Sequence, residues 1–553
     1  MGVIDEARAW RDQDPDAETR AELDHLIGAA EAGDVSAVAE LHDRFDARLE
    51  FGTAGLRGEL AAGPNRMNRV LVAQAARGFA DFLLGRAGRG AGDDAPSVVI
   101  GYDGRKNSQR FALDTAELMA GAGIRAILLP RLLPSPVLAF AVRHFGVSAG
   151  VMVTASHNPP RDNGYKVYLG DADAGSQIVS PADAEIEASI RRVAAGSIEG
   201  LPRSSDYEVA DEEIVDEYVR QTAALVTTPP SARLKVVYTA MHGVGWETSR
   251  RVFAAAGFEA PVVVEEQRDP DPDFPTVAFP NPEEPGALDL AYATARAASA
   301  DLIIANDPDA DRLAVAIPLA AGGWRALTGN EVGMLLGWRA AEGGATQLAA
   351  SLVSSPALGA VAAHYGIAFT ETLTGFKWVS RVPGLDYGYE EALGYLVDPQ
   401  KVRDKDGISA AVAFLDLADS LAASGVSIEQ HLIDFAERFG AFASGQVSVR
   451  VSELGEIPRI MADIRANPPT SLGGASVEST DDFANGYGDF PPSDIVRFRL
   501  SGGSRVIVRP SGTEPKVKVY LDAASNAGTG TERVAAATTQ VAALEADVRA
   551  LLA

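Results

Sequence analysis

The chain has 553 residues, of which 46% are hydrophobic and 23% charged, and it contains no cysteine. A chain of this length is too long for a single hydrophobic core, so we expect three or four domains. The lack of cysteine excludes disulfides, thiolate catalysis and cysteine-based zinc sites. The formal net charge of −27 predicts repulsion from nucleic acid and anionic membranes, so an anionic ligand would need a local basic cluster.

The N-terminal part predicts helices, because apolar residues recur at helical spacing in 18–30 and 36–48. No basic segment followed by an apolar one begins the chain, and no apolar run is long enough to span a bilayer. These features predict a soluble cytoplasmic protein without a signal peptide. A Gly-rich loop, Phe51–Gly58, follows and contains Arg57. It could present N–H groups and a guanidinium to an anion, or it could be a flexible connector.

A repeated pattern of strand, helix, glycine and strand follows. It runs from 97 to 129, recurs from 234 to 264, and recurs again from 348 to 370. Each repeat predicts a βαβ unit with a largely parallel sheet, so we expect three similar α/β domains in tandem. The last part differs, with short strands predicted at 446–451, 495–500, 504–508 and 516–522 and a helix at 531–552. That pattern predicts an α+β domain.

The expected fold class is therefore α/β, with three tandem domains of mixed, largely parallel sheets and a C-terminal α+β domain around one central cleft. We expect a helical extension at 1–50, α/β domains at 51–225, 226–322 and 323–443, and the α+β domain at 444–553. The predicted junctions include Gly322–Gly323 and Ala441–Gly445.

One hydroxyl and one imidazole stand side by side after an apolar run. Residues 149–153 predict a buried strand that leads into Thr154–Pro159, where Ser156 precedes His157. A serine at a rigid strand end beside a base is a candidate nucleophile. A turn that merely ends the strand is the alternative, because asparagine and proline follow.

Three carboxylates alternate along the loop Asp307–Arg312, at Asp307, Asp309 and Asp311. Two charges about 4 Å apart repel by roughly 4 kcal/mol at an effective dielectric near 20, so the loop predicts a bound Mg²⁺, Ca²⁺ or Mn²⁺. An EF-hand is excluded, because its sixth position would be Arg312 and its twelfth Pro318. A solvated acidic turn fits poorly, since apolar segments flank the loop on both sides.

Three further loops carry weaker signals. Arg509–Lys516 has two hydroxyls, an arginine, a lysine and a glycine, which favours a phosphate site over a plain hairpin turn. Thr374–Lys377 offers a cation, and Gly388–Gly394 offers a carboxylate that suits sugar hydroxyls. Either of the last two could be a surface loop.

Together these loops resemble the signature loops of the alpha-D-phosphohexomutase superfamily, the phosphoglucomutases and phosphomannomutases. They occur in the order typical of that family, and the resemblance covers nearly the whole chain. The branch that it is most similar to contains the phosphoglucomutase 2-type enzymes. The resemblance implies an intramolecular phosphotransferase that interconverts hexose 1-phosphate and hexose 6-phosphate, of glucose or mannose. The reaction would pass through a phosphoserine enzyme and a bound hexose 1,6-bisphosphate, which also serves as activator.

The resemblance also implies roles for individual residues. Ser156 would carry the phosphoryl group and, with Asp307, Asp309 and Asp311, would bind one Mg²⁺ per chain. The remaining residues would surround the transferring group (Arg57, His157, Lys166, Arg312), contact the sugar (Thr374, Gly375, Lys377, Glu390) or bind the non-reacting phosphate (Arg509, Ser511, Gly512, Thr513). Lys166 and His157 are both candidates for the general base.

The sugar loop departs from the family pattern, because Ala392 stands where serine is common and Tyr389 precedes the glutamate. The sugar therefore stays open, and a phosphopentomutase is an alternative. A metal-dependent sugar phosphatase and a non-catalytic sugar-phosphate-binding protein are two further alternatives. The expected partners are small sugar phosphates, without nucleic acid or membrane, and the chain would be a monomer or homodimer.

Overall fold

The computed structural model describes residues 2–87, 95–451, 455–510 and 516–551. The chain forms two compact units. Unit 1 comprises Met1–Pro318 and Asp398–Asp416, and unit 2 comprises Leu319–Val397 and Leu417–Ala553. Each unit is described below by itself.

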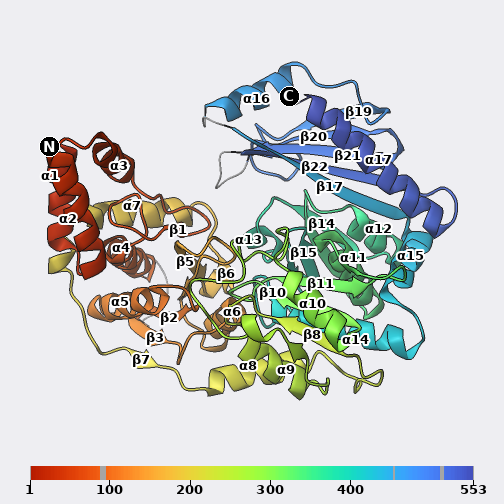
Figure 1. Cartoon of the computed structure of the whole chain (residues 1–553), viewed down its shortest axis with the longest axis horizontal. Coiled ribbons are helices and arrows are strands. Elements are labelled where there is room, and N and C mark those ends of the chain that lie inside the picture. Colours follow the sequence, from red (N-terminus) through yellow and green to blue (C-terminus); the bar gives the residue numbers. More distant parts are fainter. Residues whose placement is uncertain (1, 88–94, 452–454, 511–515, 552–553) are drawn as a thin grey trace. The chain divides into compact units, whose positions relative to one another are not determined.

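Unit 1 begins with three helices, α1 (Val3–Gln13), α2 (Ala17–Glu31) and α3 (Val35–Phe45). The N-terminal caps of α2 and α3 are Asp16 and Asp34, whose carboxylates accept main-chain N–H groups. These helices share a core with α4 (Arg69–Ala87), beside which they lie in Figure 1. The N-terminal residues are helical as expected, and their buried side chains pack into the core of unit 1.

The first sheet of unit 1 follows the order β1-β5-β4-β2-β3-β7, with β6 paired to β5. Strands β4, β2, β3 and β7 run parallel, and β5 runs antiparallel to β1 and β4. Helices α4, α5 and α7 contribute to the main core against this sheet. The bounds are β1 (Leu56–Glu59), β2 (Ser97–Tyr102), α5 (Ser108–Gly121), β3 (Arg125–Leu128), α6 (Ser135–His144), β4 (Ala149–Val153), β5 (Asp162–Leu169), β6 (Ser176–Gln177), α7 (Ala182–Ala194), β7 (Glu208–Val209) and α8 (Glu213–Ala223).

The second sheet of unit 1 contains strands in the order β11-β10-β8-β9. Strand β8 is parallel to β10 and β9, and β11 is antiparallel to β10. The bounds are β8 (Val236–Thr239), α9 (Gly245–Ala255), β9 (Val262–Val263), α10 (Asp289–Ala298), β10 (Leu302–Asn306) and β11 (Leu313–Pro318). Because β10 and β11 are buried apolar strands, the acidic loop between them is held at both ends.

Unit 2 holds a mixed sheet of order β14-β13-β15-β16, in which only β16 is antiparallel to its neighbour. The bounds are β12 (Trp324–Ala326), α11 (Gly329–Glu342), β13 (Gln347–Ser351), α12 (Ala357–Tyr365), β14 (Ala368–Thr372), α13 (Phe376–Val379), β15 (Tyr387–Glu390), β16 (Gly394–Leu396) and α15 (Ile428–Phe439). A capping box formed by Thr328 and Glu331 begins α11.

The C-terminal part of unit 2 is an antiparallel sheet of order β17-β22-β21-β20-β19-β18. The bounds are β17 (Ala441–Arg450), α16 (Glu456–Ala466), β18 (Ser471–Leu472), β19 (Ala475–Asp482), β20 (Val496–Leu500), β21 (Arg505–Pro510), β22 (Lys516–Ser525) and α17 (Gly530–Leu551). Short 3₁₀ turns occur at Asp171–Asp173, Ile198–Gly200, Glu265–Gln267 and Ser501–Gly503.

The structure confirms the expected fold class, with α/β parts of mixed sheets and a C-terminal α+β part. The three repeats are present as β2-α5-β3, β8-α9-β9 and β13-α12-β14. Residues Ala441–Gly445 form the first half of β17 and pair with β22. The domain boundaries, including the junctions at Gly322–Gly323 and Ala441–Gly445, and the central cleft stay predictions.

Residues Asp398–Asp416 pack into unit 1, although they lie within the range predicted for the third α/β domain. The boundary between the units falls inside α14 (Gly407–Ala423). In the described part of the chain, no single helix is long and apolar enough to cross a membrane. One bent pair, α14 with α15, meets the length and composition criteria together.

Candidate functional site

Ser156 lies in the loop between β4 and β5 of unit 1, as the sequence predicts. Its backbone is left-handed, with φ of 53°, and its N–H donates to Thr154 Oγ1 at 2.8 Å. Its hydroxyl donates to Asp307 Oδ2 at 3.0 Å, and His157 Nδ1 is 3.2 Å from the same oxygen. The loop therefore places the hydroxyl between a carboxylate and an imidazole.

The three aspartates of the acidic loop converge as predicted. Asp307, Asp309 and Asp311 are buried, and one carboxylate oxygen of each lies within 4.8 Å of the others. Asp309 also accepts a bond from Ser135 Oγ at 2.6 Å. Asp309 Oδ1 and Asp311 Oδ1 are buried and accept no hydrogen bond. Such oxygens fit a hard divalent cation, so the donor set suits Mg²⁺.

The pKa values of the three aspartates are shifted in different directions. Burial, together with the charges of Asp309 and Asp311, holds the pKa of Asp307 well above its usual value. Burial would also raise the pKa of Asp311, but Lys166, Lys405 and Arg312 outweigh it and lower that pKa. Asp309 has a lowered pKa as well, because Lys166 and Ser135 outweigh burial and the Asp311 charge. Lys166, Lys405 and Arg312 thus offset part of the repulsion among the three carboxylates.

Lys166 on β5 contacts the acidic loop directly. Its Nζ lies 2.6 Å from Asp309 Oδ2 and 2.8 Å from Asp311 Oδ2. Burial alone would lower the pKa of this ammonium, but the two carboxylates raise it above its ordinary value. Lys166 is therefore protonated at neutral pH, which suits charge neutralisation and weakens its candidacy as a base.

Two arginines from the sequence predictions also lie here. Arg312 Nε is 3.9 Å from Asp307 Oδ2 and 3.9 Å from Asp311 Oδ1, and it donates no hydrogen bond. Arg57 on β1 donates to Asn158 Oδ1 at 3.1 Å, in the Ser156 loop. The structure thus brings Arg57, His157, Lys166 and Arg312 around Ser156 and the triad.

His157 is the one neutral candidate among these basic groups. Burial, followed by the nearby charges of Arg312 and Arg57, lowers the pKa of His157 well below 6.5. The imidazole is therefore uncharged at neutral pH.

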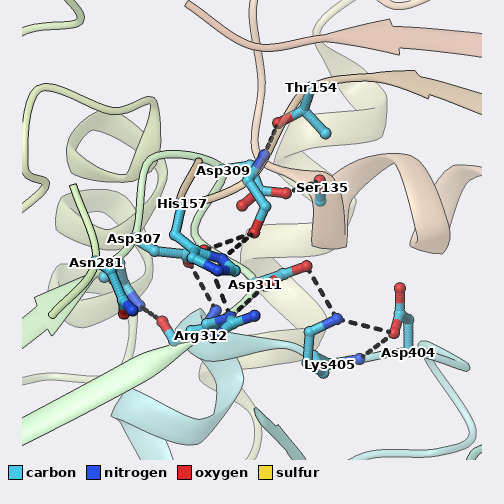
Figure 2. A network of polar contacts seen from close by, with 12 residues as sticks. Ser135, Thr154, His157, Asn281, Asp307, Asp309, Asp311, Arg312, Asp404 and Lys405 are labelled. Carbon is cyan, nitrogen blue, oxygen red and sulfur yellow. Dashed lines mark hydrogen bonds and ion pairs between the residues drawn. The ribbon is translucent and has the colours of Figure 1, made fainter. Parts of the chain in front are cut away.

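Sequence reasoning missed a further cation, Lys405, which Figure 2 shows between Asp311 and Asp404. Its Nζ lies 3.1 Å from Asp311 Oδ2 and 3.5 Å from Asp404 Oδ1. Asp404 in turn accepts bonds from Tyr168 and Gln177, which ties this segment to β5 and β6. The available signal was the alternating charges at 403–406 directly before an apolar helix.

Unit 2 carries the predicted sugar loops. Gly375, with φ of 115°, donates its N–H to Glu390 Oε1 at 2.6 Å, so the two segments meet. Thr374 and Lys377 flank Gly375 in the same segment. The next glutamate, Glu391, accepts bonds from the hydroxyls of Ser351 and Ser354, which sequence reasoning missed.

The structure also places Tyr389 of the sugar loop and Arg509 of the predicted phosphate loop, both in unit 2. Tyr389 is fully buried, and its hydroxyl donates to Asn330 and to the Ser355 carbonyl, so its side chain belongs to the core. Arg509 lies near the end of β21. Ser511, Gly512 and Thr513 lie outside the described residues.

Four family models match the chain in succession. They are phosphoglucomutase/phosphomannomutase alpha/beta/alpha domain I at residues 48–196, domain II at 216–320, domain III at 328–439, and the C-terminal domain at 447–539.

Named relatives agree with these matches. A Haemophilus influenzae protein named "Probable phosphomannomutase" is 56% identical over 85% of this chain and 96% of its own length. Mouse phosphopentomutase is 35% identical over 87% of this chain and 85% of its own length. Human glucose 1,6-bisphosphate synthase is 34% identical over 87% and 85%.

Solved structures show the same fold. A phosphoglucomutase/phosphomannomutase family protein from Burkholderia thailandensis has a TM-score of 0.69 at 21% identity, covering 92% of this chain and 97% of its own. The Paramecium phosphoglucomutase parafusin has a TM-score of 0.68 at 18% identity, covering 91% and 95%.

The fold and the domain matches define a phosphosugar mutase of the alpha-D-phosphohexomutase superfamily. Within it, the chain belongs to the phosphoglucomutase/phosphomannomutase family. The enzymes of this family are mutases, which places the chain among the isomerases.

Proposed function

We propose that the chain interconverts hexose 1-phosphate and hexose 6-phosphate, of glucose or mannose, by way of a phosphoryl group carried on Ser156. The observation that carries the proposal is the Ser156 hydroxyl, held 3.0 Å from one carboxylate of a buried three-aspartate cluster. The 56% identity to a protein named as a phosphomannomutase supports the hexose.

The reaction consists of two transfers in opposite directions. The phosphoryl group leaves Ser156 Oγ for the free hydroxyl of the sugar monophosphate, whose proton passes by way of a base to the Ser156 Oγ that is freed. The product is a bound hexose 1,6-bisphosphate. This bisphosphate reorients, its other phosphoryl group moves to Ser156 Oγ, and the Ser156 proton passes by way of the base to the sugar oxygen that is freed. Phosphorus and charge therefore balance over one cycle.

Asp307, Asp309 and Asp311 would hold a Mg²⁺ ion, which would neutralise charge on the phosphoryl oxygens when bound. The residues around it add further positive charge. Lys166 and Lys405 contact the triad, and both have raised pKa values because the carboxylates outweigh their burial. Arg312 lies within 3.9 Å of two of the carboxylates.

We assign the base to His157 in preference to Lys166. Lys166 Nζ donates to Asp309 Oδ2 at 2.6 Å and to Asp311 Oδ2 at 2.8 Å, so it is engaged with the triad as a cation. His157 Nδ1 is also 3.2 Å from Ser156 Oγ, within reach of an oxygen that exchanges the phosphoryl group.

The loops of unit 2 would bind the sugar and the phosphate that is not reacting. Glu390 and Lys377 would contact sugar hydroxyls, with Thr374 and Gly375 beside them, and Arg509, Ser511, Gly512 and Thr513 would bind the distal phosphate. Glu391 is fixed by two serine hydroxyls and forms a further candidate for a sugar contact.

A phosphopentomutase is the second candidate. Relatives named phosphopentomutase and phosphoribomutase are 34% to 35% identical over 87% to 94% of the chain, and Ala392 and Tyr389 depart from the common sugar loop.

The test is a substrate panel of glucose, mannose, glucosamine and ribose 1-phosphates, assayed with Mg²⁺ and a trace of hexose 1,6-bisphosphate. We expect turnover of glucose or mannose 1-phosphate. We expect Ser156→Ala to lose it, with intact mass spectrometry showing phosphate on the wild-type chain only. Turnover of ribose 1-phosphate alone would overturn the hexose assignment, and full turnover by Ser156→Ala would overturn the phosphoserine mechanism.

The same assay separates the remaining classes. Release of inorganic phosphate at the rate of substrate loss would identify a phosphatase. Binding of sugar phosphates without any conversion would identify a non-catalytic binding protein.

A further inference from the structure

Arg105 packs against the Ser156 loop, and its guanidinium donates hydrogen bonds to main-chain carbonyls of that loop. Its Nη2 donates to the carbonyls of Ser156 and Asn158, each at 2.6 Å. Its Nη1 donates to the carbonyls of Pro159 at 2.8 Å and Asp162 at 3.1 Å. One buried guanidinium therefore binds four carbonyls of a single turn.

The backbone of this turn requires such support. Ser156 has φ of 53°, a left-handed conformation that a residue with a Cβ atom adopts at a cost in free energy. The Ser156 N–H is fixed by Thr154 Oγ1 at 2.8 Å, and its carbonyl is fixed by Arg105. The peptide groups on both sides of Ser156 are therefore held by side chains, and its hydroxyl is directed at Asp307.

Arg105 is itself held in place. Asp103 accepts the Arg105 N–H at 3.0 Å and the Ser108 hydroxyl at 2.7 Å, and its Oδ2 lies 3.6 Å from Arg105 Nε. The ring of Phe274 lies 5.0 Å from the guanidinium carbon. A lysine has three donors on one nitrogen and cannot reproduce a planar fork that reaches four carbonyls.

We propose that Arg105, together with Thr154, is a positioning residue that locks Ser156 in its left-handed conformation, so that Oγ stays in line for both phosphoryl transfers. Arg105 binds carbonyl groups and not the hydroxyl, so a phosphate on Ser156 Oγ would take none of its acceptors. The role in transfer rests on the proposed function, whereas the hold on the loop does not.

The test compares Arg105→Lys with wild type below the unfolding temperature of both. We expect kcat to fall about a hundredfold, as misplacement by about 1 Å does in other enzymes, with KM changed less than about threefold. Phosphate loading of Ser156 from hexose 1,6-bisphosphate, followed by intact mass, is expected to slow by a similar factor. Amide hydrogen exchange in residues 155–162 is expected to accelerate.

Arg69→Lys is the matched control. Arg69 forms a two-pronged ion pair with buried Asp114, at 2.7 and 3.0 Å, in the same unit and away from the Ser156 loop. We expect this variant to lose comparable stability in a urea titration while kcat and exchange in 155–162 stay at wild-type values. A similar loss of kcat in both variants would show a general effect of lost stability and would overturn the positioning role.

Two further outcomes are decisive. If Arg105→Lys fails to fold, Thr154→Val removes the other hold on Ser156, and wild-type kcat in that variant overturns the proposal. If wild type turns over no sugar phosphate, the proposed function fails by itself. Unchanged exchange in residues 155–162 of Arg105→Lys then overturns the hold on the loop.

Discussion

At the scale of single residues, the site concentrates charge in a chain that is acidic overall. Three buried aspartates face two lysines and an arginine within 3.9 Å, so each cation offsets repulsion among the carboxylates. The missed residue, Lys405, therefore has a testable role in the reaction.

Replacing Lys405 with methionine removes the ammonium 3.1 Å from Asp311 and leaves Lys166 in place. We expect kcat to fall about a hundredfold, because the loss of one electrostatic contact to a transition state has about that effect. Steady-state kinetics with the preferred hexose 1-phosphate measures it. Lys106→Met, which removes an exposed lysine paired with Glu18, serves as control and should keep wild-type kcat. Equal rates in wild type and Lys405→Met would contradict the role.

His431 gives unit 2 a dependence of stability on pH. Its ring stacks on Trp338 with centroids 4.2 Å apart, and burial lowers its pKa below 6.5 despite Asp434 and Glu342. The unfolded chain then binds more protons than the folded one below pH 6.5, so stability is present above that pH and is lost as pH falls below it.

His431→Phe keeps the stacked ring and removes this titration. In urea unfolding at pH 7.5 and 5.5, we expect wild type to lose more stability than the variant. The difference is at most about 1.4 kcal/mol per pH unit below pH 6.5. Identical pH slopes in the two proteins would show that the histidine does not titrate in this way.

At the scale of elements, the metal loop depends on a close approach by the loop after β8. A Cβ atom at Gly243 would lie 2.3 Å from the Pro308 Cα, and the next N–H, of Val244, donates to the Pro308 carbonyl at 2.9 Å. This contact fixes the start of the aspartate loop.

Gly243→Ala should therefore displace the loop. We expect at least a tenfold weaker affinity for Mg²⁺, measured by calorimetry on the folded variant, because the three oxygens no longer converge. Gly28→Ala is the control, since nothing lies within 4 Å of its added Cβ inside α2. That substitution should leave affinity unchanged and raise helix stability by up to about 1 kcal/mol. Wild-type affinity in Gly243→Ala would contradict this account.

Features whose residues are neighbours in the sequence were predictable from it. The apolar run before Ser156, the alternate aspartates and the strand–helix–strand repeats are contiguous, so one segment carries the whole pattern. Lys405 and Arg105 were not predictable, because their partners lie far along the chain and only packing brings them together. The strand expected at 446–451 begins at Ala441, since the small residues of Ala441–Gly445 do not show in the sequence that they pair with β22.

At the scale of the whole molecule, a divalent cation should stabilise the folded chain. The triad forms only on folding, so Mg²⁺ binds the native state and raises stability by about 2.7 kcal/mol at a hundred times its Kd. Calorimetric unfolding with Mg²⁺ or with EDTA measures the shift in Tm. Asp309→Asn should show a smaller shift. An equal shift in both proteins would place the stabilising ion elsewhere.

The return of Asp398–Asp416 to unit 1 has a consequence for biosynthesis. A ribosome delivers Met1–Pro318 first, but the segment that carries Lys405 emerges only after all of Leu319–Val397. The acidic loop of the nascent chain therefore lacks one of its counter-ions until Leu319–Val397, a part of the other unit, has been synthesised. For the same reason no single cut separates the two units, and a fragment that ends at Pro318 would carry the Ser156 loop and the three aspartates without Lys405.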